Sequence, residues 1–94
     1  MYILLKYQYE TDIYQYETDE RIVIDYKVSN NLDELKTPSP TNDIVTIWPD
    51  GINQYIVFID LSRVDEVKNN FYIETIKLAK QCMREYNLIK ILEK

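Results

Sequence analysis

The chain contains no His, one Cys and one Gly among its 94 residues. Imidazole is the most common general base and a frequent metal ligand, so its absence excludes His-based nucleophilic triads and Cys/His zinc sites. One Gly cannot build the glycine-rich loops that bind phosphate groups. One Cys cannot form an intramolecular disulfide, and a free thiol is typical of a reducing cytoplasm. We therefore expect a cytoplasmic, non-enzymatic protein that uses no metal and no cofactor.

Long apolar runs are also absent. No stretch of 18 apolar residues could span a membrane, and the N-terminus lacks the basic region and cleavage site of a signal peptide. A hydrophobic content of 46% and an aromatic content of 13% are nevertheless typical of a folded globule. The length fits a single domain, residues 1–94.

The charge is unevenly distributed along the chain, which has a formal net charge of −5. Residues 1–60 hold 11 acids and 4 bases, whereas residues 61–94 hold 5 acids and 7 bases. Residues 10–20 include five acids and no base. Because phosphate-binding surfaces need Lys or Arg, we do not expect direct nucleic-acid binding. The acidic region is suited to a basic protein partner.

Two segments near the N-terminus, 2–9 and 21–28, alternate between the two faces of a half-buried β-strand. In the second segment we expect one face to carry Ile22, Ile24, Tyr26 and Val28. Because residues 2–9 open the chain, we place them at a sheet edge. A free edge invites pairing with a second copy, so a homodimer is expected.

A short repeat lies between these strands: the sequence YQYETD occurs at 7–12 and at 14–19. Two strand pairings are compatible with it. A turn at 10–13 would form a long hairpin that places Tyr9 opposite Tyr14, whereas a further turn at 18–20 would give a three-stranded meander. The long hairpin is slightly favoured, because neither acidic turn has a Gly for a positive φ.

The middle of the chain combines a loop with a hairpin. Residues 29–43 have almost no apolar side chains after Leu35, which predicts an exposed, mobile excursion. Strands are expected at 44–48 and 55–59, joined by the turn Pro49-Asp50-Gly51. The second of these strands is apolar on both faces, which predicts a central strand covered on both sides.

A helix is predicted over residues 63–86, with Ser62 as its N-cap and Asn87 just beyond its end. Its apolar stripe includes Cys82, which we interpret as a buried, unreactive thiol. Residues 88–92 are interpreted as a final strand, which would form a parallel pair through a crossover. The predicted fold is therefore α+β: a mainly antiparallel β-sheet of four to five strands, with one long helix (63–86) packed on one face and a short C-terminal strand.

Two carboxylates, Asp60 and Asp65, flank the predicted junction between strand and helix. Sheet ends often carry functional sites, but a carboxylate at a helix start is ordinary capping, and we favour capping. The segment 56–64, IVFIDLSRV, followed by a helix and the segment 88–92, resembles the core of a STAS domain of the anti-sigma-antagonist type. That resemblance implies an alternative function as a regulatory or phosphotransfer-linked domain. The family's phosphorylated Asp-Ser-Ser-Gly turn is replaced here by the sequence DEVK at 65–68, so no site residue is carried over.

The segment 7–20, which we call the Tyr/acid block, is the candidate functional site. Tyr is enriched in protein-binding surfaces because it offers a large contact area at a low entropy cost, and neighbouring acids steer a basic partner. The alternative is a solvated hairpin tip, acidic for solubility. The candidate partner-binding residues are Tyr7, Tyr9, Glu10, Asp12, Tyr14, Tyr16, Glu17, Asp19 and Glu20.

These observations predict a small acidic protein-binding module. Compact acidic proteins without catalytic groups are often inhibitors, such as immunity proteins or phage and viral anti-defence proteins, anti-CRISPR proteins among them. We expect this chain to occupy a basic surface of a host protein or a toxin-like protein, in the host cytoplasm if its source is viral.

Overall fold

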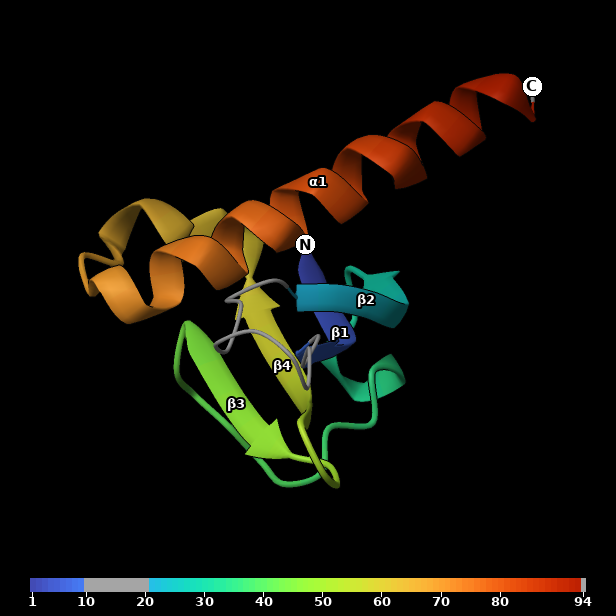
Figure 1. The fold of residues 1–94 in the computed structure, drawn as a ribbon. Coiled ribbons are helices and arrows are strands. Elements are labelled where there is room, and N and C mark those ends of the chain that lie inside the picture. The colour runs from blue at the N-terminus through green and yellow to red at the C-terminus, as the bar shows by residue number, and fades with distance from the viewer. Residues whose placement is uncertain (10–20, 94) are drawn as a thin grey trace.

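A computed structural model describes residues 1–9 and 21–93, which form one antiparallel sheet crossed by one long helix (Figure 1). The sheet order is β2-β1-β4-β3, and every neighbouring pair is antiparallel. The elements in chain order are β1 (Tyr2–Tyr9), β2 (Arg21–Ser29), the 3-10 helix η1 (Leu32–Glu34), β3 (Val45–Pro49), β4 (Gln54–Asp60), the 3-10 helix η2 (Leu61–Glu66) and α1 (Asn70–Leu92). The predicted α+β class is confirmed, with four strands in this part of the chain.

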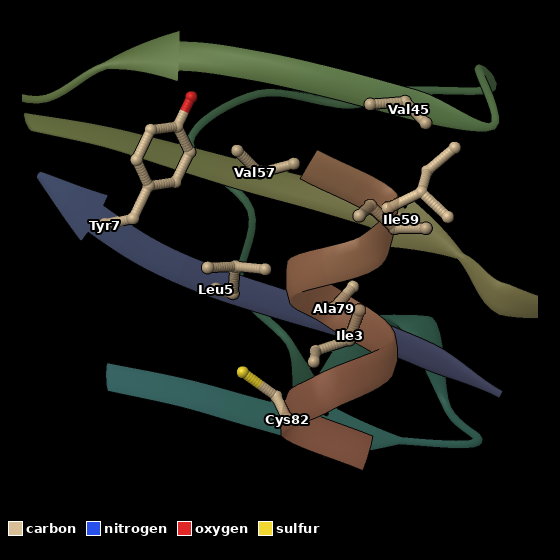
Figure 2. Packing of buried hydrophobic residues seen from close by; sticks show 9 residues of the cluster. Ile3, Leu5, Tyr7, Val45, Val57, Ile59, Ala79 and Cys82 are labelled. Atoms are coloured by element: carbon tan, nitrogen blue, oxygen red, sulfur yellow. The ribbon is translucent and has the colours of Figure 1, made fainter. Parts of the chain in front are cut away.

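The core lies between α1 and one face of the sheet. On β1 the alternating residues Ile3, Leu5 and Tyr7 are at most 2% exposed, because they all point to this face. They pack in one cluster with aliphatic residues of β3 and β4 and with the helix residues Ala79 and Cys82 (Figure 2). The predicted burial of the free Cys82 thiol is confirmed, at 4% exposure.

The hairpin between β3 and β4 is confirmed. Gly51 has a φ of +107°, which a residue with a Cβ rarely adopts, and the Asp50 N–H donates to the Gln54 carbonyl at 2.8 Å. Strand β4 is an inner strand of the sheet, as expected, with Val57, Phe58 and Ile59 all buried.

The N-terminal strand is not at a sheet edge, because β1 lies between β2 and β4. The expected basis for a homodimer, pairing along β1, is therefore wrong. Both pairings proposed for the repeat placed β1 beside residues 14–16, and both are wrong for β1, since it lies between β2 and β4 and Tyr9 pairs with Arg21. The proposed turns at 10–13 and 18–20 lie outside the described residues.

An irregularity in the β1–β2 register reverses the expected faces of the first half of β2, whereas Tyr26 and Val28 lie on the core side as predicted, opposite Leu5 and Ile3. Lys6 pairs with Asp25 but Tyr7 pairs with Val23, so Ile24 is an extra residue on β2. A bulge of this kind shifts every following side chain to the other face. Val23 and Arg21 consequently share the core side of the sheet with Tyr7 and Tyr9, while Ile22 and Ile24 are 44% and 47% exposed.

The segment between β2 and β3 lies over the second face of the sheet, and most of its residues are exposed, as predicted. Its Leu35 is only 2% exposed. Its polar groups bond to side chains of that second face: the Lys27 Nζ donates to the Glu34 carbonyl at 2.7 Å, and the Trp48 Nε1 donates to the Ser39 Oγ at 2.8 Å. One apolar anchor and several hydrogen bonds thus attach a segment of polar composition to the sheet.

The helix begins and ends later than predicted. Asp60 caps η2, since its Oδ1 accepts from the Ser62 N–H at 3.1 Å, and Asn69 caps α1 by accepting from the Phe71 N–H at 3.0 Å. Ser62 is therefore not the cap of the long helix. Two potential caps follow one another in the chain, and the extended backbone at Val67 separates the two helices.

The predicted strand at 88–92 is wrong, because α1 continues to Leu92. After Gly51 the chain has no Gly or Pro that would stop a helix, and Asn87 lies within α1. The last turns project beyond the sheet and have no strand beside them (Figure 1). The predicted parallel pair is therefore absent from the described sheet. The STAS resemblance also depended on a strand at 88–92, which is helical here. No described helix is both long and apolar enough to cross a membrane.

Candidate protein-binding site

Tyr9 and Arg21, the residues that flank the segment 10–20, lie side by side at one end of the sheet. Tyr9, the last residue of β1, is the register partner of Arg21, the first residue of β2. The Tyr9 N–H also donates to the Asn53 carbonyl at 2.9 Å, which ties this end of β1 to the β3–β4 turn. The two residues that flank the acidic segment are therefore both fixed in the sheet.

The Tyr/acid block is only partly within the described residues. Tyr7 is a core residue, 2% exposed, so it supports the surface from below and does not present its ring to a partner as predicted. Tyr9 is half-buried beside it. The remaining predicted residues lie outside the described residues: Glu10, Asp12, Tyr14, Tyr16, Glu17, Asp19 and Glu20.

The base of this sheet end is an aromatic cluster of Tyr7, Tyr9 and Tyr55. Tyr55 stacks on Tyr7 with ring centroids 5.6 Å apart, and Tyr9 meets both rings edge to face, at 5.7 Å from Tyr7 and 5.6 Å from Tyr55. The Arg21 guanidinium lies over two of these rings, 5.0 Å from Tyr9 and 5.8 Å from Tyr7. Stacked aromatic and cation–π contacts of this kind hold the start of β2 rigidly against the sheet.

The electrostatics of the cluster favour the neutral phenol. Burial and, to a smaller extent, the neighbouring Tyr9 raise the pKa of Tyr7 to about 12, while Arg21 acts in the opposite direction. Tyr7 therefore stays protonated at neutral pH and acts as a packing residue with a polar tip.

A groove of about 440 Å³ runs between β2 and α1, beginning at Arg21. Its walls carry the carboxylates of Asp25 and Glu85, and Cys82 lies at its floor. Burial, followed by the charge of Glu85, raises the pKa of the Cys82 thiol. Burial likewise raises the pKa of Tyr26, with smaller contributions from Cys82 and Glu85. A raised pKa disfavours the reactive thiolate, which supports an unreactive Cys82.

The candidate carboxylate Asp60 has a structural role. Asp60 caps η2 through its contacts with Ser62, which confirms the capping interpretation for that residue. Within the described ranges, no group of three or more Cys, Asp or Glu side chains is arranged to hold a metal ion.

The net charge of the protein lies in the segment 10–20. The described residues 1–9 and 21–93 carry ten bases and eleven acids, so they are almost neutral, whereas the segment 10–20 carries five acids and no base. The sheet and helix thus form a nearly neutral support for a strongly acidic segment.

Sequence reasoning did not identify Arg21 and Tyr55 as part of this site. The contact of Tyr55 with Tyr7 depends on the β1–β4 pairing, which joins strands almost fifty residues apart. The contact of Arg21 depends on the bulge at Ile24. The only signal in the sequence was the isolated base that directly follows five acids. Comparison with known proteins finds no family model, curated protein or solved structure that matches this chain.

Proposed function

We propose that this protein is a small, non-enzymatic binding module that inhibits a target protein by covering one of its basic surfaces. The contact would be made by the acidic segment 10–20 together with the neighbouring Tyr9. The observation that carries the proposal is the concentration of the net charge in one segment that is flanked by the paired residues Tyr9 and Arg21.

The rigid base explains how such a segment could bind tightly. A loop that must be ordered on binding loses conformational entropy, and fixed ends reduce that loss. Tyr9 adds an aromatic contact whose position is set by Tyr7 and Tyr55. A partner of matching chemistry carries clustered Lys and Arg residues. It would be a basic host protein in an anti-defence role or a toxin in an immunity role.

Charge also determines the expected kinetics. Five acids in one segment attract a basic protein over distances up to about the Debye length, roughly 10 Å at 0.1 M salt. Such attraction raises the association rate more than it slows dissociation. Binding should therefore weaken with added salt mainly because association becomes slower.

The test compares two quadruple variants that each remove four negative charges. The first neutralises the segment with Glu10→Gln, Asp12→Asn, Glu17→Gln and Asp19→Asn. The matched control neutralises exposed acids elsewhere with Asp33→Asn, Asp43→Asn, Asp65→Asn and Glu93→Gln. Partners are captured from lysate of the native host on each protein, and the association rate of the captured partner is then measured across a salt series.

The segment variant should lose the partner and flatten the salt dependence, while the control should keep both. Equal binding by the two variants would contradict the proposal, because the four acids of the segment would then matter no more for binding than four acids elsewhere. Captured partners without a basic surface would contradict it as well.

A further inference from the structure

The face of α1 that points away from the sheet changes character along its length. Successive helical residues turn by about 100°, so the residues opposite the buried Ala79 and Cys82 form one stripe. We call this stripe the outer face. Its exposed members are Glu74, Lys77, Lys80, Gln81, Arg84, Glu85, Leu88, Ile91 and Leu92.

Beyond the sheet the outer face becomes apolar. Leu88, Ile91 and Leu92 are 58%, 67% and 76% exposed, and every residue from 87 to 93 is exposed. This end of the helix projects past the sheet (Figure 1). Apolar side chains gathered on a projecting element are typical of an interaction surface, and a polar stripe that turns apolar is not explained by the core of this chain.

The charges along the outer face are sorted by side. Taking Leu88 as the centre line, Lys77, Lys80 and Arg84 lie on one flank at roughly 20° to 80° from it. Glu74 and Glu85 lie on the other flank, at about 40° and 60°. The Glu74–Lys77 ion pair at 3.2 Å crosses the line, but both of its side chains are at least 60% exposed, so it contributes little to stability.

This sorting distinguishes the two ways in which a second copy could pack on the outer face. In an antiparallel two-fold pair, each flank faces the same flank of the partner, so base would meet base. In a parallel two-fold pair, each flank faces the opposite one. Arg84 then lies level with Glu85 of the second copy, twice by symmetry, and Leu88 meets its equivalent on the centre line, with Leu92 about 40° to one side.

We propose that the outer face of α1 is a self-association surface that takes a second copy of this chain in parallel orientation. Two observations favour a second copy as the occupant. The two flanks carry opposite charges, and the apolar residues Leu88 and Leu92 lie on or beside the centre line. The helix of 23 residues gives a contact up to about 34 Å long. None of its residues belongs to the acidic segment, so this proposal does not rest on the proposed function.

The test uses charge reversal at two exposed positions. At positions 84 and 85, the Arg84→Glu chain has acid on both flanks, and the Glu85→Arg chain has base on both flanks. Sedimentation equilibrium is run on wild type and on each variant from about 1 µM to about 1 mM chain, the range that covers weak to moderate dissociation constants. Wild type should dimerise, and each single variant should dimerise at least about tenfold more weakly.

Mixing the two variant chains provides the decisive measurement. Native mass spectrometry of the mixture should show a heterodimer, because acid flanks then face base flanks twice. The double variant Arg84→Glu/Glu85→Arg should recover the wild-type dimer. A wild type that stays monomeric across this concentration range would overturn the proposal. The outer face would then bind a groove of a different protein. A dimer insensitive to both reversals would overturn it too.

The apolar centre line is tested by two serine variants one residue apart. Leu88→Ser should weaken dimerisation more than Ile89→Ser, because Ile89 lies about 100° away from the centre line although it is also half exposed, at 50%. An effect of Ile89→Ser as large as that of Leu88→Ser would contradict the assigned face.

Discussion

The two faces of the sheet are covered in different ways. One face packs against α1 through a continuous cluster of apolar side chains that includes Ile3, Leu5 and Val57. The other face is covered by the segment between β2 and β3, which has Leu35 as its buried apolar residue and otherwise attaches through hydrogen bonds such as Trp48–Ser39. One cover depends on apolar area and the other on a few specific contacts.

The difference shows how a segment of polar composition can form part of a fold. The apolar face tolerates many sequences, because burial is roughly proportional to area and has no direction. The second face depends on individual donors and acceptors. A single substitution at Leu35 should therefore weaken the attachment of this segment, although the segment as a whole has few apolar residues.

The largest expected effects come from removing the buried Leu of each face. Leu5→Ala should lower the free energy of unfolding by about 3 kcal/mol, since Leu-to-Ala changes in cores cost about 2–5 kcal/mol. Leu35→Ala should cost about 2 kcal/mol, at the lower end, because a segment can collapse into part of the cavity. Urea unfolding followed by circular dichroism measures both.

Leu32→Ala is the control for the second face, because Leu32 lies in the same segment but is 39% exposed. It should change stability by less than about 0.5 kcal/mol. If Leu35→Ala is equally mild, the segment does not cover the sheet, and the comparison of the two faces fails.

Alkaline pH should act on the α1 face through Tyr7. Its pKa is raised from 10.0 to about 12 in the folded protein. Below pH 10 both states keep the phenol proton, but between pH 10 and about pH 12 the unfolded chain loses it first. The free energy of unfolding should therefore fall with rising pH across this window, by on the order of 2 kcal/mol in total.

Urea titrations at several pH values measure this fall. Tyr7→Phe should flatten it, whereas Tyr72→Phe, which removes a Tyr outside the aromatic cluster, should leave it in place. A fall that is just as steep in Tyr7→Phe would show that another group is responsible.

The α1 face was predictable because periodicity reports apolar area. The alternation in β1 and the three- and four-residue steps that include Ala79 and Cys82 both identified core side chains. The β3–β4 turn was predictable because a positive φ at Gly51 has a residue-specific cause. Each of these signals is local in the sequence.

The remaining features depend on choices between similar local alternatives. Ser62 and Asn69 are both good caps, and only the extended backbone at Val67 decides between them. The alternation in β2 correctly placed Tyr26 and Val28 on the core side, but one extra residue, Ile24, reversed it over residues 21–23. In the candidate site, the same extra residue places Arg21 on the face of the aromatic cluster.

The smallest expected effect is also the sharpest, because it differs in sign between the faces. Thr75 is 1% exposed on the α1 face, and its Oγ1 has no hydrogen-bond partner among the described residues. Ser39 on the second face accepts a hydrogen bond from the Trp48 Nε1 at 2.8 Å. A buried polar group without a partner costs about 1–3 kcal/mol, whereas a typical hydrogen bond contributes about 0.5–1.5 kcal/mol.

Thr75→Val keeps the shape and the helix propensity, so it should stabilise the protein by about 1 kcal/mol. Ser39→Ala should destabilise it by about 0.5 kcal/mol, because this hydrogen bond is exposed to solvent. Urea midpoints measured side by side test both signs. Destabilisation by Thr75→Val would mean that its hydroxyl has a partner in the folded protein, and the contrast between an apolar cover and a hydrogen-bonded one would then be lost.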